Sequence, residues 1–316
     1  MQEGKKIGMA GGDGRMEAAF RVLLRASDEG FPGLRGAEFA LWGAGFREAD
    51  DPAGVSKEKR RAVRCKDAES AVREADAVIL PLPVSRDGIR LNAPGMGGDG
   101  PRVTELLGLM KPGAMVFGGR IPETAMEVCR ERGLSAVDYF EDEAFQIRNA
   151  VPTAEGAVAA CIDALPVTIA GLSCTVLGYG RVGRTLAGRL LALGAEVTAA
   201  ARSPRDLAWA EADGCVPVPL ADWRKNPPGH GAIFNTVPAR ILEADTLDRI
   251  KRGAVLFDLA PGAEDVRCCG RDEAERAGIR VIPLPSLPGK CAPETAGEII
   301  GGAVLAALGA KEGGSI

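Results

Sequence analysis

The sequence predicts an α/β protein with two parallel-sheet domains, a cofactor and substrate cleft between them, and a C-terminal helix that returns to the first domain. Short apolar runs alternate with helix-like stretches along most of the chain, which is the pattern of parallel sheets covered by helices. The length of 316 residues also suits two domains, since a domain commonly has about 150 residues.

The first domain is expected over residues 1–152, joined by residues 290–316. Its apolar runs predict strands at Lys6–Ala10, Glu38–Trp42, Ala77–Leu80, Ala114–Phe117 and Ser135–Val137. Helical spacing predicts helices at Met16–Arg25, Ala68–Arg73 and Thr124–Arg132. The stretch Ser85–Arg102 is rich in Gly, Pro, Asn and Asp, so it is expected to be a long loop that buries little. The last helix, Glu294–Leu308, is expected to pack back on this domain.

The second domain is expected over residues 153–289, beginning with a linking helix at Thr153–Leu165. Apolar runs predict strands at Cys174–Gly178, Glu196–Ala200, Cys215–Val218, Ala232–Thr236, Ala254–Asp258 and Arg280–Leu284. Six strands with intervening helices are the number expected for a complete dinucleotide-binding domain.

A glycine fingerprint lies where the first of these strands ends. Gly178-Tyr179-Gly180-Arg181-Val182-Gly183 follows an apolar strand and opens the predicted helix Val182–Leu193. In Rossmann domains the first glycine makes a tight turn, the second lets the backbone approach a pyrophosphate, and the third allows close helix–strand packing. The amide groups of the helix N-terminus then bind the pyrophosphate. Both domains are therefore expected to be Rossmann-like, with the nicotinamide cofactor on the second.

The residues after the next strand predict which cofactor is bound. NAD enzymes place an acidic residue there, about 20 residues past the glycines. Here the segment reads Ala201-Arg202-Ser203-Pro204-Arg205 and contains no carboxylate. Arginine can pair with a 2′-phosphate, so NADP is expected in preference to NAD, with Arg202, Ser203 and Arg205 as contacts. The alternative is that Arg202 is an exposed loop charge.

Polar residues also follow two further strands of this domain. Asn235-Thr236-Val237-Pro238 follows one strand, and Asp258-Leu259 ends another. Because ligands bind at the carboxyl ends of strands in open α/β sheets, these residues are expected to contact the cofactor or the substrate. The alternative is that they cap the following helices.

Composition excludes several classes of function. Lys and Arg number 39 and Asp and Glu 43, giving a net charge of −4. A mild acidic excess is not the basic footprint of proteins that bind nucleic acid or anionic membranes. No apolar run reaches the roughly 20 residues of a membrane-spanning helix, and no signal-peptide pattern opens the chain. A cytoplasmic protein is expected.

The cysteines and the histidine exclude further chemistry. The eight cysteines form no C-x-x-C pair and several lie in apolar runs, so we expect buried thiols and no metal site. His230, the single histidine, lies just before a predicted strand, away from the strand ends where ligands bind. This disfavours dehydrogenases that use a histidine as acid and base.

Two further stretches are distinctive. One is Asn149 followed by Pro152-Thr153-Ala154-Glu155-Gly156, and the other is Leu287-Pro288-Gly289 followed by Ala292-Pro293-Glu294-Thr295-Ala296-Gly297. Together with Gly11-Gly12-Asp13, the glycine fingerprint and Asn235-Thr236-Val237-Pro238, they give a chain that resembles the family of the dipicolinate synthase A subunits over nearly its full length.

The resemblance implies an oxidoreductase that works with a second, flavoprotein-like B subunit of dipicolinate synthase. It would convert a cyclic dihydro- or hydroxytetrahydro-dipicolinate to dipicolinate in the mother cell of a spore-forming bacterium. The matched stretches, which also include Pro83-Val84-Ser85, offer Ser85, Asn149, Thr153 and Thr295 as polar contacts to the substrate, and Glu155 as the acid–base candidate. The alternative for Glu155 is a carboxylate in the first turn of a helix that Thr153 caps.

Two other functions remain open from the sequence. The chain is compatible with another NADP-dependent two-domain oxidoreductase, similar to shikimate or alanine dehydrogenase, because fold alone does not select the reaction. It is also compatible with a non-catalytic, cofactor-binding scaffold. Self-association into a homo-oligomer is compatible with either.

Overall fold

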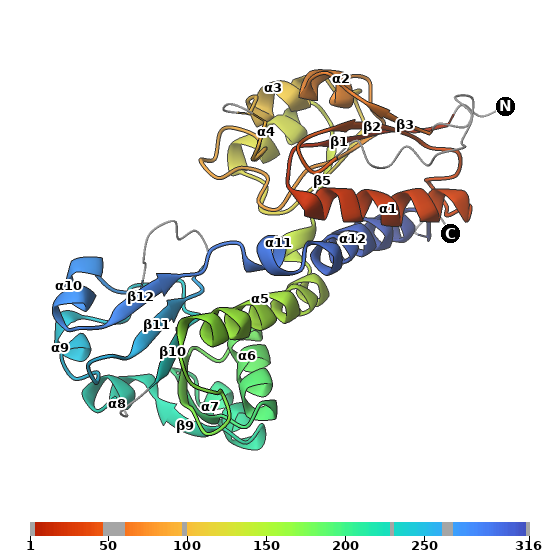
Figure 1. Ribbon diagram of the computed structural model, residues 1–316. Coiled ribbons are helices and arrows are strands. Elements are labelled where there is room, and N and C mark those ends of the chain that lie inside the picture. The colour runs from red at the N-terminus through yellow and green to blue at the C-terminus, as the bar shows by residue number, and fades with distance from the viewer. Residues whose placement is uncertain (1–3, 47–60, 97–99, 228–230, 261–267, 314–316) are drawn as a thin grey trace. The chain divides into compact units, whose positions relative to one another are not determined.

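The computed structural model describes residues 4–46, 61–96, 100–227, 231–260 and 268–313. Contacts within the chain divide it into two compact units. The first unit comprises Met1–Gln146 and Pro293–Ile316, and the second comprises Ile147–Ala292. Each unit is built around one six-stranded parallel sheet (Figure 1), which confirms the predicted fold class.

The first sheet has the strand order β3-β2-β1-β4-β5-β6. The strands are β1 (Lys6–Ala10), β2 (Glu38–Trp42), β3 (Ala62–Arg64), β4 (Ala77–Ile79), β5 (Met115–Gly118) and β6 (Ser135–Asp138). The helices of this half of the chain are α1 (Gly14–Asp28), α2 (Ala68–Val72), α3 (Val103–Gly108) and α4 (Glu123–Glu131), with a 3-10 helix η3 (Tyr139–Glu141). The five strands predicted for this sheet are confirmed.

Two elements of the first unit were not predicted. They are helix α3 and strand β3, a three-residue edge strand with an exposed Val63. Ser85–Arg102 is a loop, as predicted, and more than half of its described residues are exposed, but its middle is not. Leu91 and Asn92 are buried, and the Asn92 carbonyl accepts the Gly12 N–H at 2.7 Å. The loop therefore folds in against the turn that follows β1.

The second sheet has the order β12-β11-β10-β7-β8-β9. Its strands are β7 (Ser173–Leu177), β8 (Glu196–Ala201), β9 (Val216–Pro219), β10 (Ala232–Asn235), β11 (Val255–Asp258) and β12 (Arg280–Pro283). Its connecting helices are α6 (Arg181–Ala192), α7 (Pro204–Ala212), α8 (Leu220–Lys225), α9 (Ala244–Leu247), α10 (Arg271–Arg276) and α11 (Leu287–Cys291). The central strands β7, β10 and β11 are nearly continuous apolar runs because helices cover both faces of the sheet.

Helix α5 (Glu143–Ala164) is longer than the predicted linking helix and includes Pro152. It begins early because the Asp142 carboxylate accepts the Phe145 N–H at 2.6 Å and caps the first turn. The division between the units falls inside α5, at Gln146/Ile147, and again at Ala292/Pro293. The boundaries expected from the sequence lie after residues 152 and 289.

Helix α12 (Pro293–Gly313) returns to the first unit and lies beside α1 (Figure 1). Small residues permit the close approach. A Cβ added at Gly297 would lie 2.3 Å from the Arg15 carbonyl oxygen, and one at Gly301 would lie 2.8 Å from the Val22 Cβ. The predicted return of the C-terminal helix is confirmed.

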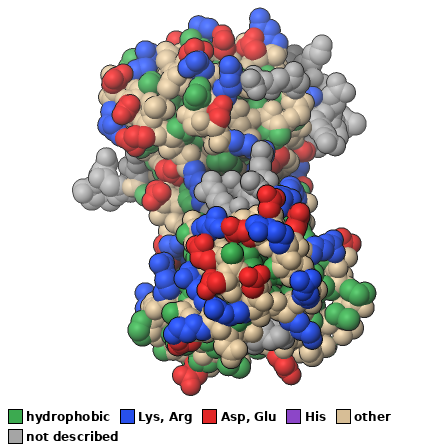
Figure 2. Space-filling view, turned by 90° about the vertical axis from the view of Figure 1, so that its left-hand side faces the viewer, with side chains coloured by type: hydrophobic (Ala, Val, Ile, Leu, Met, Phe, Trp, Pro, Cys, Tyr) green, Lys and Arg blue, Asp and Glu red, His purple; other side chains and the backbone are tan. Residues whose placement is uncertain are grey.

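Acidic and basic side chains are interspersed on the face of the molecule drawn in Figure 2, in keeping with the small net charge. Among the described residues, no helix is both long enough and apolar enough to cross a membrane.

Candidate functional site

The glycine loop of the second unit joins the end of β7 to the start of α6. Gly178 has a φ of +91°, a conformation that favours glycine, and its N–H donates to the Ala200 carbonyl at 2.8 Å. Gly180 is the N-cap of α6, and it supplies no side chain to the amide groups of the first turn. The loop therefore turns sharply and leaves the α6 N-terminus uncapped by its own side chains.

The three glycines of the loop have three different environments. A Cβ on Gly178 would lie 2.6 Å from the Thr236 hydroxyl oxygen, and a Cβ on Gly183 would lie 2.1 Å from the Gly178 carbonyl oxygen. A Cβ on Gly180 would meet nothing within 4 Å. The first and third glycines are thus required by close packing, whereas the second faces open space. This is the arrangement in which backbone can approach a pyrophosphate.

The remaining loop residues lie on the surface or in the core. Arg181 is exposed, and Val182 is partly buried and packs against the core of the second unit.

Residues that follow β10 pack against the glycine loop. The Thr236 hydroxyl donates to the Leu177 carbonyl at 2.9 Å, and Val237 contacts the position of a Gly178 Cβ. Pro238 is exposed. The Thr236 hydroxyl proton is engaged within the protein, so this residue shapes the loop.

Asn235 and Asp258 form a buried pair between the ends of β10 and β11. Both side chains are fully buried. The Asn235 amide donates to the Asp258 carboxylate at 2.8 Å and to the Val237 carbonyl at 3.0 Å. The Asp258 carboxylate also accepts the Ala260 N–H at 3.2 Å, and Leu259 is buried beside it. These contacts hold two strand ends together beside the glycine loop.

The end of β8 presents two unpaired arginines. Arg202 and Arg205 are exposed, and neither makes a side-chain hydrogen bond or ion pair with any described residue. Ser203 lies between them and caps α7 by accepting the Asp206 N–H at 3.4 Å. Two guanidinium groups with no internal partner among the described residues are thus available to an anion at this strand end.

The corresponding turn of the first unit is filled by its own side chains. Asp13 caps α1, and the buried Arg15 forks onto its carboxylate at 2.8 and 2.9 Å. Arg15 also donates to the Leu82 carbonyl at 2.7 Å. Burial raises the pKa of Asp13, but the hydrogen bonds and charge of Arg15 outweigh burial and hold that pKa below its ordinary value. The Asp13 carboxylate is therefore already the negative group at the α1 N-terminus, whereas no side chain caps the α6 N-terminus.

Two predicted substrate contacts lie in the first unit. Ser85 is buried, and its hydroxyl donates to the Asp87 carboxylate at 2.8 Å. The backbone N–H groups of Arg90 and Ile89, followed by the Ser85 hydroxyl, lower the pKa of Asp87 to about 2. Thr295 lies exposed in the first turn of α12, and no described residue accepts its hydroxyl.

The other three candidates lie on α5 in the second unit. Asn149 and Thr153 are four residues apart and share a face of the helix, and the Thr153 hydroxyl donates to the Asn149 carbonyl at 2.8 Å. Glu155 points to the opposite side, since two residues turn a helix by about 200°. It pairs with Arg189 at 3.4 Å. Arg189 lies roughly 12 Å along α6 from the glycine loop, so the structure does not bring Glu155 to that loop.

The alternative assigned to Glu155 is wrong. Because α5 begins at Glu143, Glu155 is not in a first turn, and Thr153 bonds back into the helix rather than capping it.

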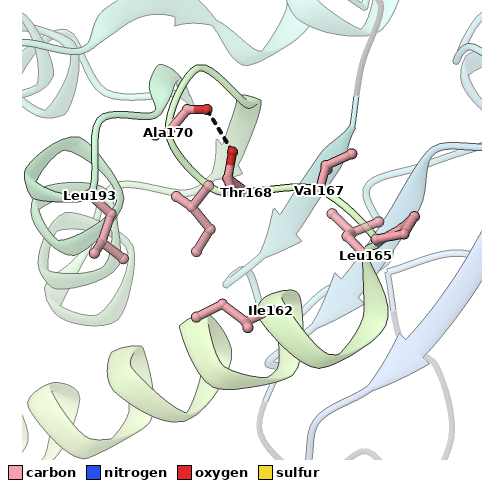
Figure 3. Close-up of a pocket in the computed structure, with 8 residues that line it drawn as sticks. Ile162, Leu165, Val167, Thr168, Ala170 and Leu193 are labelled. Atoms are coloured by element: carbon pink, nitrogen blue, oxygen red, sulfur yellow. Dashed lines mark hydrogen bonds between the residues drawn. The ribbon is translucent and has the colours of Figure 1, made fainter.

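An apolar hollow of about 450 Å³ lies near the amino end of β7, away from the glycine loop at its carboxyl end (Figure 3). Ile162 reaches it from α5, Leu165 from the residue just after α5, and Leu193 from the end of α6 (Figure 3). Thr168 and Ala170, which precede β7, close its wall with a 3.3 Å hydrogen bond. Ligands of open α/β sheets bind at the carboxyl ends of the strands, so this hollow is not the candidate site. His230 lies outside the described residues.

Sequence reasoning missed the polar contacts around the loop. Tyr179 is the variable second residue of the fingerprint, so the motif gives it no role, yet it is buried and bonded to Asp213. The Asp13–Arg15 pair was also missed. Asp13 just before a helix was an available capping signal, but the bond from Arg15 to the distant Leu82 carbonyl could not be identified from spacing.

Comparison with known proteins gives relatives along the whole chain. Residues 6–140 match the family model for the N-terminal domain of the dipicolinate synthase A subunit. The dipicolinate synthase A subunit of Bacillus subtilis (strain 168) is 28% identical over 99% of this chain and 100% of its own. These matches confirm the resemblance that the motifs carried.

Solved structures agree with this result. The crystal structure of the dipicolinate synthase A subunit from Bacillus halodurans has a TM-score of 0.79 and 26% identity, covering 98% of this chain and 99% of its own. The corresponding crystal structure from Bacillus subtilis has a TM-score of 0.80 and 27% identity, covering 99% and 98%. An L-alanine dehydrogenase shares the two-domain fold at a TM-score of 0.60 and 16% identity, over 98% and 90% of the two chains.

Proposed function

We propose that this chain is the NADP-dependent dehydrogenase component of a dipicolinate synthase, because it is similar to the dipicolinate synthase A subunits in sequence and fold along its length. In this proposal it oxidises a cyclic dihydro-dipicolinate to dipicolinate by loss of a hydride to NADP⁺ and of a proton, or a hydroxytetrahydro-dipicolinate by the same losses together with loss of a water molecule. The observation that carries the proposal is the set of three environments at Gly178, Gly180 and Gly183, which fit a dinucleotide loop and are hard to explain as a simple turn.

The residues present fit a nicotinamide dinucleotide. The open space at Gly180 and the uncapped N-terminus of α6 suit a pyrophosphate. A bound nicotinamide would supply the acceptor for a hydride from the substrate ring. The buried Asn235–Asp258 pair keeps the neighbouring strand ends in place and is a positioning element in this proposal rather than a direct ligand, because both side chains are fully buried.

We favour NADP over NAD because of the arginines after β8. Arg202 and Arg205 are exposed and unpaired with any described residue, so a 2′-phosphate would gain charge-assisted hydrogen bonds without breaking existing ones. Between these arginines, the Ser203 hydroxyl oxygen accepts the Asp206 N–H of α7. The hydroxyl proton of Ser203 remains available to the phosphate.

The substrate carboxylates need hydrogen-bond donors that the fold has not already engaged. Asn149 and Thr295 meet this requirement, since no described residue accepts from either side chain. The hydroxyl protons of Ser85 and Thr153 are directed to Asp87 and to the Asn149 carbonyl, which leaves those two residues as acceptors or as supports. We therefore propose Asn149 and Thr295 as the leading contacts.

The proton that leaves the ring needs no strong base, because aromatisation supplies driving force. We do not assign it to Glu155, since that carboxylate is paired with Arg189 on a different side of α5 from Asn149. In this proposal the chain acts with a flavoprotein-like B subunit, in the mother cell of a spore-forming bacterium, and a homo-oligomer is compatible with it.

The test follows NADPH and dipicolinate together when the purified chain is incubated with NADP⁺ and freshly generated product of dihydrodipicolinate synthase, with and without the B subunit. Stoichiometric formation of both products by the chain alone supports the proposal, and turnover only with the B subunit makes the complex the active unit. Asn149→Asp should raise KM for the substrate while leaving NADP⁺ affinity within twofold, because a negative charge would replace a neutral amide facing the dicarboxylate. Cofactor binding without turnover in either mixture would refute the proposal.

A further inference from the structure

The second residue of the glycine fingerprint is turned into the protein. Tyr179 is buried, and its hydroxyl donates to the Asp213 carboxylate at 3.0 Å. The Cys215 sulfur lies 3.6 Å from the same hydroxyl. The fingerprint requires nothing of this position, so the contact is a property of this chain rather than of the motif.

Asp213 is held from a second side by α6. Arg184, in the first turn of that helix, donates to the two Asp213 carboxylate oxygens at 2.6 and 3.0 Å. Its guanidinium also lies 4.0 Å from the centre of the Trp209 ring on α7. The hydrogen bonds from Arg184, aided by Tyr179 and opposed by burial, lower the pKa of Asp213. We call these four residues, Tyr179, Arg184, Trp209 and Asp213, the Asp213 clamp.

Asp213 occupies an unfavourable place for an acid. It is the C-cap of α7, where the helix dipole and the last carbonyl groups disfavour a negative charge. Its three charge-assisted or hydroxyl hydrogen bonds all come from the glycine loop and from α6. An acid at this position is therefore explained by the hydrogen bonds from Tyr179 and Arg184, and not by its place at the end of α7.

The clamp connects the two elements that carry the phosphate sites of the proposed cofactor. Helix α6 begins at the pyrophosphate loop, and α7 begins at Pro204, after its N-cap Ser203, between Arg202 and Arg205. We propose that the Asp213 clamp fixes the spacing between the pyrophosphate site and the 2′-phosphate site, so that Tyr179, Arg184 and Asp213 are positioning residues for NADP. This inference rests on the proposed function.

A fixed spacing has a specific consequence for binding. A ligand that spans both sites gains from their preorganisation, because its second phosphate binds at a high effective concentration. A ligand that occupies only the 2′-phosphate site gains nothing. Loss of the clamp should therefore weaken the spanning ligand by about tenfold and leave the single-site ligand within twofold.

The experiment compares two probes by calorimetry on the full chain. The spanning probe is 2′-phospho-ADP-ribose and the single-site probe is adenosine 2′-monophosphate. The variants are Asp213→Asn, which removes the charge, and Tyr179→Phe, which removes one hydroxyl with little change of shape and should show a smaller effect in the same direction. Arg249→Gln is the matched control, since it breaks an exposed ion pair with Asp245 in the same unit and should leave both dissociation constants unchanged.

The ratio of the two dissociation constants is the readout, because a general loss of structure would weaken both probes alike. A rise in that ratio of about tenfold for Asp213→Asn supports the clamp. Equal weakening of both probes, or no weakening of either, overturns the clamp and leaves the proposed function standing. A wild-type chain that binds neither probe overturns the cofactor assignment, and the role of the clamp with it.

Discussion

Replacement of single glycines by alanine should separate cofactor binding from stability on one helix. At Gly180 the backbone has φ −80° and ψ −162°, which alanine adopts readily, and an added Cβ meets nothing within 4 Å. We expect Gly180→Ala to change the free energy of unfolding by no more than about 0.5 kcal/mol. The methyl group would stand where the pyrophosphate approaches, so NADPH affinity should fall at least about tenfold, or 1.4 kcal/mol.

Gly183→Ala should instead act mainly on stability. Its Cβ would lie 2.1 Å from the Gly178 carbonyl oxygen, whereas Cβ atoms in proteins essentially never come under 3.0 Å, so the start of α6 must move by about 0.9 Å. Overpacking of this kind costs about 1–3 kcal/mol. That cost should lower the melting temperature by several degrees, with cofactor affinity lost as a consequence of the displaced helix.

Gly188→Ala is the matched control on the same helix. Gly188 is an exposed interior position of α6, where an added Cβ meets nothing within 4 Å, so alanine should stabilise the unit by about 0.5–1 kcal/mol. The assays are urea unfolding and titration of NADPH fluorescence on all three variants. Wild-type NADPH affinity in Gly180→Ala would refute the placement of the pyrophosphate, and wild-type stability in Gly183→Ala would refute the close packing.

Three further predictions follow from named contacts. Arg202→Ala should weaken NADP binding by about tenfold or more, from the loss of a charge-assisted hydrogen bond of roughly 1.5–3 kcal/mol, without weakening NAD, and an unchanged ratio of the two dissociation constants would count against the 2′-phosphate site. Asn235→Ala should lower the free energy of unfolding by about 1–3 kcal/mol, because it leaves the buried Asp258 short of a donor; urea unfolding indistinguishable from wild type would contradict this. Since the pKa of Asp13 is held below its ordinary value, the charged carboxylate contributes stability above an unfolded pKa of about 3.9, and that stability is lost as pH falls through the lower folded pKa. The stability difference between wild type and Asp13→Asn should therefore shrink below about pH 4, whereas a difference that stays constant with pH would refute the role of the Arg15 ion pair.

Apolar runs were sufficient for the central strands of both sheets, because a parallel strand buried on two faces must be a nearly continuous apolar run. Sequence patterning failed at the edge strand β3, where Val63 is 62% exposed and no such run is required. It also failed at the start of α5, which was expected at Thr153, just after Pro152, but lies at Glu143. There the Asp142 cap and the burial of Ala150 and Ala154 carry the helix through the proline.

In the candidate site, too, some features could be predicted from the sequence and others could not. The positions of Gly178, Gly180 and Gly183 were identified from the spacing of the motif, because each position depends on a missing Cβ. The residue that crowds Gly178, Thr236 at the end of another strand, was visible only in the structure. Which polar side chains remain available to a ligand was decided only by tertiary structure. Asn235 is joined to Asp258 across 23 residues and Glu155 to Arg189 across 34, and such partners are set by how strands and helices pack, which no local pattern in the chain encodes.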